Sequence, residues 1–112
     1  MNEINNLINA LLKFRDERDW KQFHDSKNLA AAISIEAAEL NELFLWKTTA
    51  EAEEVNKQKI KEELADILVY SLFLAEKHGF DVVEIIHNKM EQNAQKYSVE
   101  KSRGKSKKYN EL

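Results

Sequence analysis

The sequence predicts an all-α protein on the strength of three observations. Proline is absent from the 112 residues and glycine occurs only at Gly79 and Gly104, so almost nothing interrupts a helix before the C-terminal segment. Apolar residues recur with helical spacing through most of the chain. Helix-capping patterns separate the periodic segments. Together these observations predict a bundle of four main helices.

The first two helices follow from periodicity and one capping residue. The first is expected over roughly Asn2 to Arg18, where apolar residues form a stripe with helical spacing. A connector of polar and aromatic residues covers 19–26. Ser26 can cap a second helix that runs to about Lys47, because its hydroxyl can accept a hydrogen bond from a free backbone N–H. The members of the first stripe are Ile4, Leu7, Ile8, Leu11, Leu12 and Phe14.

A charged link leads into a long third helix. Thr48 and Glu51 have the spacing of a capping box, and the charged region 48–59 is expected to form an irregular or short helical connection. The long helix is expected from about residue 60 to 78. Gly79 then gives it a C-terminal stop, because glycine adopts the left-handed conformation at little cost.

The fourth helix begins at a second capping pattern. Asp81 and Glu84 have capping-box spacing, and the helix they open is expected to run to about Tyr97. We therefore expect a helical domain over 1–97 and a basic, partly flexible tail over 98–112. The tail is either a solvated terminus or a segment that folds over an anionic ligand.

The third helix also predicts an assembly. Its segment ILVYSLFLA, residues 67–75, is apolar on nearly every side, and a helix of that kind must be surrounded. Three other helices in so short a chain can hardly surround it. The segment therefore predicts a homodimer or a homotetramer, because obligate interfaces resemble a domain core cut in half.

Composition excludes several classes of protein. Hydrophobic residues make up 43% and charged residues 33%, which fits a folded domain, and the net charge of −3 does not fit a stable nucleic-acid partner. Cysteine is absent, which excludes thiolate chemistry. No apolar run approaches the roughly 20 residues of a membrane span, and the first ten residues do not have the pattern of a signal peptide. We expect a cytoplasmic protein without a membrane partner.

Two acidic pairs stand where helical periodicity predicts apolar residues. Glu36 and Glu39 form one pair, Glu63 and Asp66 form the other, and each pair has the i, i+3 spacing that places both carboxylates on one helix face. Carboxylates that point into a bundle are costly unless a positive charge compensates them. Oxygen-only ligands favour Mg²⁺, Mn²⁺ or Ca²⁺ over zinc. The competing interpretation is ordinary surface charge with helix boundaries displaced by a residue or two.

These acids belong to a longer pattern. The motif is ExxE at 36–39, ExxD at 63–66 and KxxxN at 89–93, flanked by RDWKQFH, ELFLW, EELADILVY and NAQKYSVEKSRGKS. The combination resembles the MazG-like all-α nucleoside triphosphate pyrophosphohydrolases, and in particular their dCTP pyrophosphatase-like branch. The resemblance implies a bundle of the MazG-like type that cleaves a nucleoside triphosphate between its α- and β-phosphates, with a substrate like dCTP expected.

The resemblance also implies a metal and a general base. Mg²⁺, with Mn²⁺ as a possible substitute, would be held by Glu36, Glu39, Glu63 and Asp66. One glutamate could act as general base, and Glu39 is favoured over Glu36 because it lies at the edge of the apolar stripe, nearer to water. Two alanines separate the glutamates of the first motif where many members carry further glutamates. The number of metal ions therefore stays open.

Further residues are assigned to the substrate by the same resemblance. Lys89, Lys96 and Arg103 would contact the phosphates. Aromatic, imidazole or amide side chains would hold the base and the sugar: Trp20, His24, Trp46, Tyr70, Asn93 and Tyr97. Tight packing against the sugar would favour deoxynucleotides. Structural interpretations remain open for several of these residues, with the tryptophans as core anchors under loops, His24 as a capping or surface residue and Tyr70 as a core residue.

Two other functions remain open. The same fold could act on dUTP or on phosphoribosyl-ATP. The chain could also be a non-catalytic helical interaction module whose assembly exposes a charged groove, with the basic tail contacting RNA or an acidic partner. Replacing an acid of the pairs would then leave function intact, whereas a catalytic site would lose activity and metal-dependent stabilisation.

Overall fold

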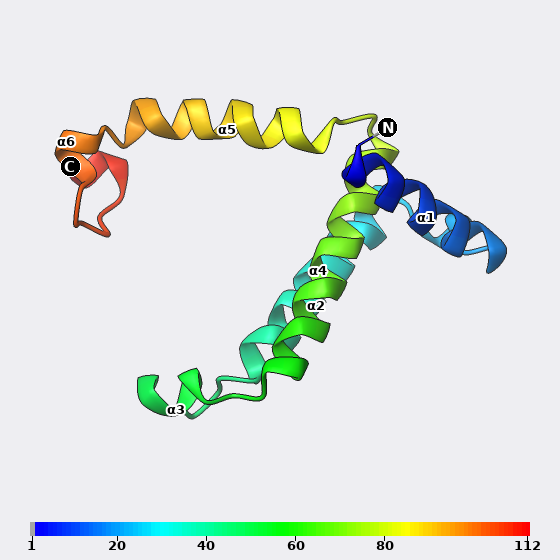
Figure 1. Cartoon of the computed structure of the whole chain (residues 1–112), viewed down its shortest axis with the longest axis horizontal. Coiled ribbons are helices and arrows are strands. Elements are labelled where there is room, and N and C mark those ends of the chain that lie inside the picture. Colours follow the sequence, from blue (N-terminus) through cyan, green and yellow to red (C-terminus); the bar gives the residue numbers. More distant parts are fainter. Residues whose placement is uncertain (1) are drawn as a thin grey trace. The chain divides into compact units, whose positions relative to one another are not determined.

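The computed structural model describes residues 2–112, and these form two compact units, one ending at Gly79 and one running from Phe80 to Leu112 (Figure 1). Every regular element in the described residues is helical, which confirms the all-α prediction. Within residues 2–112, no helix has both the length and the apolar character needed to cross a membrane.

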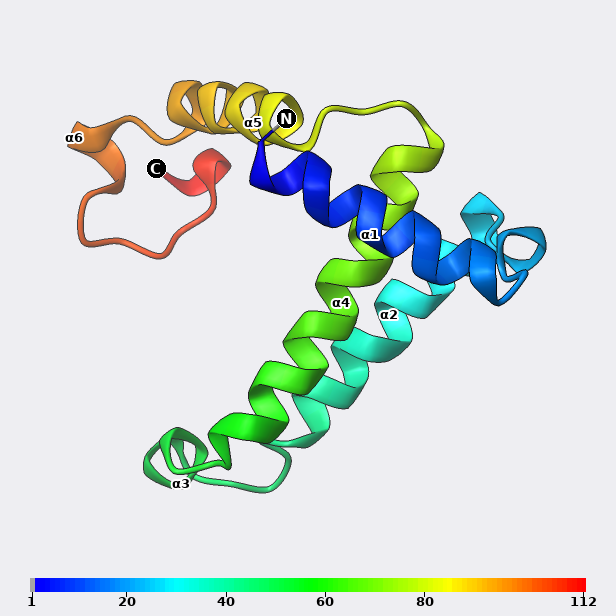
Figure 2. The same cartoon turned by 45° about the vertical axis from the view of Figure 1, so that its right-hand side comes forward.

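The first unit is built around a pair of long helices. Helices α2 and α4 lie side by side in opposite directions, and α1 packs against α4 (Figures 1 and 2). A short 3₁₀ helix, η1, joins α1 to α2, and α3 lies in the connection between α2 and α4. The elements are α1 (Glu3–Glu17), η1 (Lys21–Phe23), α2 (Ser26–Glu42), α3 (Thr49–Glu53) and α4 (Lys57–Lys77).

Helix α2 differs from its prediction at both ends. Its cap is Asp25, whose carboxylate accepts a hydrogen bond from the Asn28 N–H at 2.7 Å, and Ser26 is the first helical residue. The Ser26 hydroxyl instead lies 2.9 Å from Nε2 of His78. The predicted end at Lys47 is wrong, because α2 ends at Glu42 and Trp46 then adopts a φ of 63°, a conformation that no right-handed helix contains.

The entry to α4 and its end follow from capping. The predicted capping box is confirmed, with the Thr48 N–H donating to Glu51 and the Glu51 N–H donating to the Thr48 hydroxyl. Asn56 caps α4, which therefore begins at Lys57, earlier than the hydrophobic periodicity indicated. Gly79 has a φ of 70°, which confirms it as the residue at which α4 stops.

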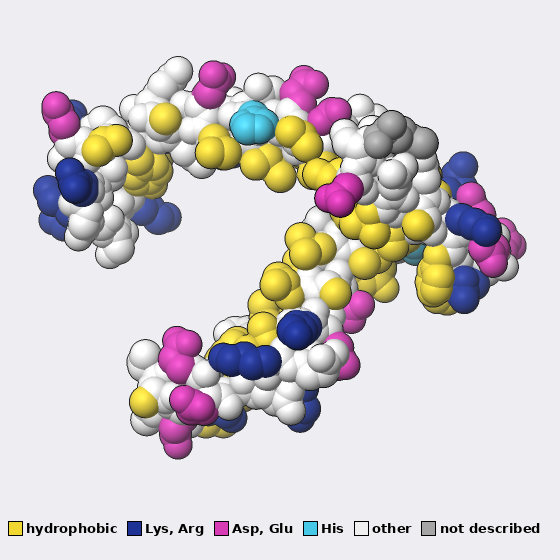
Figure 3. All heavy atoms as spheres, in the orientation of Figure 1, with side chains coloured by type: hydrophobic (Ala, Val, Ile, Leu, Met, Phe, Trp, Pro, Cys, Tyr) yellow, Lys and Arg dark blue, Asp and Glu magenta, His cyan; other side chains and the backbone are white. Residues whose placement is uncertain are grey.

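The core of the first unit is small. Among the described residues, the buried apolar side chains are Leu29, Val55, Phe73 and Ala75. Leu68, on the apolar face of α4, remains 54% exposed. Figure 3 shows apolar side chains at the surface along α4. Within the first unit, part of α4 is therefore uncovered, even though its sequence predicts a surrounded helix.

The second unit contains α5 (Val82–Lys96), α6 (Val99–Ser102) and a 3₁₀ turn, η2 (Tyr109–Glu111). Asp81 caps α5 by accepting from the Glu84 N–H at 2.9 Å. Within this unit the tail folds back on the end of α5, where the Tyr109 ring lies edge-on to Tyr97 at 6.1 Å and Lys96 Nζ lies 4.8 Å from the centre of the Tyr109 ring.

Helix α5 presents an apolar stripe that stays exposed. Val83, Ile86 and Met90 recur with helical spacing, and each is more than one third exposed. Figure 3 shows apolar side chains gathered along α5 on the face in view. The second unit therefore has little apolar core of its own.

Candidate metal and nucleotide site

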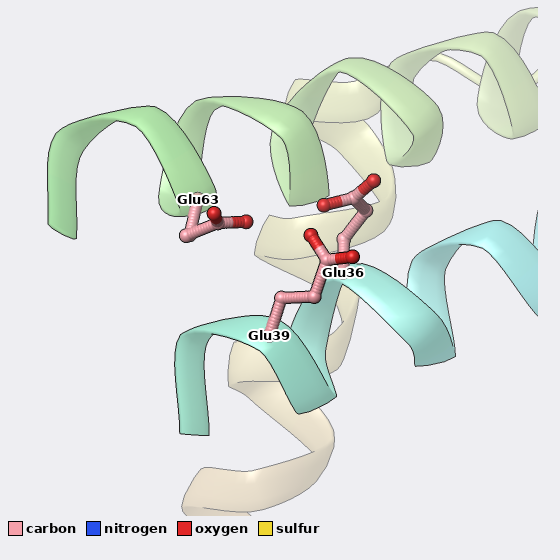
Figure 4. A group of neighbouring side chains, drawn as sticks. All are labelled: Glu36, Glu39 and Glu63. Carbon is pink, nitrogen blue, oxygen red and sulfur yellow. The ribbon is translucent and has the colours of Figure 1, made fainter. Parts of the chain in front are cut away.

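Three of the predicted carboxylates come together between the two long helices. Glu36 and Glu39 come from α2 and Glu63 comes from α4, and their carboxylate oxygens all lie within 4.8 Å of one another. Figure 4 shows the three carboxylates facing the space between the helices. The i, i+3 spacing places Glu36 and Glu39 on one face of α2, and the antiparallel pairing brings Glu63 opposite them.

The cluster is electrostatically strained. Oε2 of Glu36 and Oε2 of Glu63 are both buried, and neither has a hydrogen-bond partner within residues 2–112. Burial raises the pKa of Glu36 to about 7, with the hydrogen bond and negative charge of Glu39 adding to the shift. Burial and the neighbouring Glu39 also raise the pKa of Glu63. The local structure therefore opposes having all three groups charged in the absence of a cation.

A divalent cation fits this set of ligands. Glu36, Glu39 and Glu63 offer only oxygen donors, which suits a hard ion such as Mg²⁺ or Mn²⁺. Two of these oxygens lack partners in a buried position, where an unsatisfied carboxylate is costly. A bound cation would satisfy both oxygens and compensate the repulsion that raises the pKa values.

Asp66, the fourth predicted ligand, lies beside this group of three. Its side chain is exposed, and its negative charge contributes to raising the pKa values of Glu36 and Glu63. Asp66 also lines a neighbouring cavity of about 270 Å³, which we call the aromatic cavity. The acidic cluster and this cavity are therefore adjacent.

The aromatic cavity brings together three of the predicted base-binding residues. Trp20 follows α1, His24 follows η1 and Tyr70 lies on α4, so sequence-distant segments converge there. The lining consists of Leu11, Phe14, Trp20, His24, Asp66, Val69, Tyr70 and Phe73. The cavity thus offers aromatic faces for a planar group, with a carboxylate at its wall.

The aromatic rings are held by contacts with one another. Phe14 and Trp20 meet edge to face, with ring centres 5.8 Å apart, and the His24 ring lies 4.9 Å from Phe73. Asp19, with a φ of 54°, turns the chain just before Trp20. Trp20 also donates its backbone N–H to the Arg15 carbonyl at 3.1 Å. These contacts fix the wall of the cavity on the α1 side.

His24 lines the aromatic cavity with a neutral imidazole. Burial, and to a smaller extent the charge of Arg15, lower the pKa of His24, so its imidazole is neutral at pH 7. Its Nδ1 is buried and has no hydrogen-bond partner among the described residues. The backbone of His24 caps η1 by donating its N–H to the Lys21 carbonyl at 3.0 Å, as the capping interpretation expected. Its half-buried imidazole also lies against Tyr70 and Phe73 in the wall of the cavity.

Trp46 is placed differently from Trp20. Its side chain is 93% exposed, and it does not line the aromatic cavity. The interpretation of Trp46 as a core anchor under a loop is therefore wrong. A tryptophan held in a left-handed conformation and presented to solvent is unusual, because its large apolar ring remains uncovered.

The predicted phosphate and sugar residues lie in the second unit. Lys89 and Asn93 lie one helical turn apart on α5, and Lys96 and Tyr97 close that helix. Arg103 directly follows α6. The roles of these residues remain predictions.

Sequence reasoning missed the apolar walls of the aromatic cavity. Leu11, Phe14, Val69 and Phe73 line it, although periodicity identified only their helical stripes. One sequence signal could have identified Phe14 as a cavity residue. Phe14 lies near the end of the predicted first helix and Trp20 lies just beyond that end, so two aromatic residues flank the turn between them. Apolar periodicity cannot distinguish a core face from a cavity wall, because both require apolar residues at the same spacing.

The family of the chain follows from comparison with known proteins. Residues 31–112 match the MazG-like family. The chain is 40% identical to dCTP pyrophosphatase 1 of Rattus norvegicus and 38% identical to that of Homo sapiens, in each case over 89% of this chain and 62% of the relative. It therefore spans less than two thirds of the length of these relatives.

A solved structure extends the likeness to the fold. A pyrophosphatase from Archaeoglobus fulgidus superposes with a TM-score of 0.84 at 41% identity, covering 88% of this chain and 94% of the other. The sequence resemblance is thereby confirmed, and the helical pair that carries the carboxylate cluster has its counterpart in an established family. This chain belongs to the MazG-like family.

Proposed function

We propose that this protein hydrolyses nucleoside triphosphates between the α- and β-phosphates, releasing a monophosphate and pyrophosphate. The observation that carries the proposal is the adjacency of the carboxylate cluster and the aromatic cavity, with Asp66 at the wall of the cavity. The pyrophosphatases to which the chain is similar support the same activity. The reaction would remove surplus or noncanonical nucleotides from a cytoplasmic pool.

The metal would be Mg²⁺, with Mn²⁺ as a substitute. Glu36, Glu39 and Glu63 would hold it, with Asp66 as a further ligand. When bound, the ion supplies positive charge to the phosphate oxygens and lowers the pKa of a water molecule.

Glu39 is the best candidate for the general base. It is the most exposed of the three clustered carboxylates, and so the best placed to accept a proton from a water molecule. The water oxygen would form the new bond to phosphorus, its proton would pass to Glu39, and pyrophosphate would leave with the electrons of the broken P–O bond. Lys89, Lys96 and Arg103 would balance the charge of the phosphates.

The base would occupy the aromatic cavity. Trp20 and Tyr70 supply faces for stacking, which is sequence-tolerant, and the imidazole of His24 would supply a hydrogen-bonding group. Asn93 and Tyr97 would contact the sugar. We favour a deoxycytidine nucleotide, in keeping with the names of the relatives.

The active form would be a homodimer or homotetramer. The described part of one copy buries few apolar side chains and leaves faces of α4 and α5 exposed. Uncovered apolar faces of this kind are typical of subunits that bury them against another copy. We further propose that Trp46, which is 93% exposed here, contacts the nucleotide held by a neighbouring copy.

A mixing experiment tests the shared site. Trp20→Ala and Trp46→Ala proteins, each weakened alone, would be unfolded together and refolded as mixed oligomers. A mixed dimer has one site with both substitutions and one site with neither, so activity should return. Activity that stays at the level of the separate variants would show that each copy uses its own two tryptophans.

A substrate panel tests the activity itself. The purified protein would be incubated with each dNTP and NTP, and with phosphoribosyl-ATP, in the presence of Mg²⁺, and the products identified. Pyrophosphate with a monophosphate is the expected result, and orthophosphate would contradict the assigned bond. Activity confined to dUTP or phosphoribosyl-ATP would replace the cytosine proposal. Failure to turn over any nucleotide would favour the interaction module.

A further inference from the structure

A second cavity lies next to the aromatic one. Its volume is about 250 Å³, and it shares the side chains of His24 and Phe73 with the aromatic cavity. None of the clustered glutamates lines it. We call it the basic cavity, and its lining consists of Arg15, Lys21, His24, Leu29, Phe73, Glu76 and Lys77.

The basic cavity carries a surplus of positive charge. Arg15, Lys21 and Lys77 are cationic, whereas Glu76 is the one carboxylate in its lining. His24 adds no charge at pH 7, because burial and the neighbouring Arg15 lower its pKa. The surrounding first unit contains more acidic than basic residues, so this local excess runs against its general charge.

Arg15 is the central feature. Its side chain is only 9% exposed, and its Nε donates to Asp16 at 2.8 Å. Its Nη1 forms an ion pair with Oε2 of Glu76 at 3.8 Å, a distance that is too long for a hydrogen bond. Within residues 2–112, neither terminal nitrogen of Arg15 donates a hydrogen bond.

This arrangement is unusual for a buried guanidinium. Buried arginines normally pair through two parallel N–H donors with a carboxylate or a phosphate. The partner of Nε, Asp16, is itself 56% exposed, and Glu76 does not come within hydrogen-bonding distance. The terminal donors of Arg15 are therefore available to a ligand in the cavity.

We propose that the basic cavity binds a small oxyanion of the phosphate class. Arg15, Lys21 and Lys77 outnumber the two nearby carboxylates, Glu76 in the lining and Asp16 on Nε of Arg15, so the net charge favours an anion. The terminal donors of Arg15 match two oxygens of a phosphate or sulfate. Lys21 and Lys77 would supply point charges from the rim. His24 and Phe73 line both cavities. An oxyanion in the basic cavity would therefore change the surroundings of two side chains in the wall of the aromatic cavity.

Orthophosphate added to the metal-free 112-residue chain tests this site. A chelator would be present so that a metal cannot hold phosphate at the carboxylate cluster, and sodium chloride would keep the ionic strength constant. The expected result is a saturable rise in the unfolding temperature, because a ligand that binds only the folded state stabilises it. Sulfate should act like phosphate, and acetate should have a much weaker effect.

Variants assign the effect to the cavity. Lys21→Gln and Lys77→Gln should each weaken phosphate binding by about three- to tenfold, and Arg15→Gln should abolish it. Lys13→Gln is the matched control, since Lys13 is exposed on α1 and does not line the cavity. NMR of the His24 imidazole gives a second readout, in which phosphate should shift the wild-type signal and Lys77→Gln should need about three- to tenfold more phosphate for the same shift.

Three results would overturn the proposal. One is a thermal effect of phosphate that does not saturate, or that chloride reproduces. Another is an equal effect in the wild type, Lys21→Gln and Lys77→Gln. The third is loss of the effect in Lys89→Gln instead, which would place the anion with the residues assigned to the substrate phosphates. If Arg15→Gln fails to fold, the two lysine variants decide the question.

Discussion

The two units of the chain divide the chemistry between them. Residues 2–79 hold the carboxylate cluster, the aromatic cavity and the few buried apolar side chains, and they contain more acidic than basic residues. Residues 80–112 contain more basic than acidic residues and leave the apolar stripe of α5 exposed. In the proposed reaction the first unit would supply the ligands for the cation, and the second would supply Lys89, Lys96 and Arg103 for the phosphates of the substrate.

The largest expected effect falls on the carboxylate cluster. Glu36→Gln should lower kcat/KM by about 10³-fold, because it removes a proposed ligand and a charge that the metal compensates. Steady-state assays with Mg²⁺ measure the loss. Glu42→Gln is the matched control, since Glu42 lies on the same helix outside the cluster and should leave activity nearly unchanged. Equal activity of the two variants would remove Glu36 from the site.

The difference in burial between the units predicts the next effect. Leu29→Ala should lower the free energy of unfolding by about 2 to 5 kcal/mol, because Leu29 is only 1% exposed and its loss leaves a cavity. Met90→Ala, at an exposed position on α5, should instead act through assembly. Its destabilisation should grow with protein concentration in thermal melts. A loss that is independent of concentration would argue against a second copy covering α5.

The aromatic cavity should show an intermediate effect. Trp20→Ala removes a stacking face worth about 1 to 3 kcal/mol, so KM should rise by roughly fivefold to 150-fold. The matched control is Phe23→Ala, because Phe23 is an exposed aromatic residue close in sequence that does not line the cavity. If both variants raise KM equally, the cavity is not the base site.

The smallest effect concerns pH in the metal-free protein. The pKa of Glu36 is about 7 in the folded state and 4.5 in its ordinary state, so the folded chain holds this proton more tightly. The stability it contributes is complete below about pH 4.5 and is lost as pH rises through about 7. Urea titrations at pH 5 and pH 8 should therefore show a larger fall for the wild type than for Glu36→Gln.

Magnesium supplies the control for this pH effect. A bound cation favours the charged carboxylates, so Mg²⁺ should stabilise the wild type more at pH 8 than at pH 5. Glu36→Gln should reduce that gain. An equal pH dependence in the wild type and the variant would assign the titration to another group.

Much of the fold could be predicted from the sequence, because its signals are local. The absence of proline, the Thr48–Glu51 capping box and the glycine after α4 act within a few residues, and each is found in the structure. The end of α2 could not be predicted in this way. Residues 43–46 are as apolar as the helix before them, and only the φ of Trp46 shows that the helix has stopped.

The site was predictable in chemistry and less so in arrangement. A carboxylate at a position where periodicity predicts an apolar residue costs free energy unless a cation compensates it. This pattern predicted that Glu36, Glu39 and Glu63 come together, and in the structure they do. The separation of Asp66 from that group depends on the crossing of α2 and α4, which periodicity does not specify. The burial of Arg15 could not be predicted from the sequence. Arg15 directly follows the apolar stripe of α1, where an exposed charged residue is equally common.

Within residues 2–112, the non-glycine residues with positive φ are Asp19 and Trp46. Their backbone conformation limits which substitutions protein engineering can introduce at these two positions. Asp19 precedes Trp20, so Asp19→Gly or Asp19→Asn should preserve the turn, whereas a β-branched residue there would displace the ring. A similar substitution at Trp46 has a drawback. Glycine would remove the backbone strain of the positive φ, but it would also remove the indole side chain. If Trp46 contacts the nucleotide as proposed, directed evolution toward thermostability should accept changes at Asp19 and retain Trp46 whenever turnover is also selected.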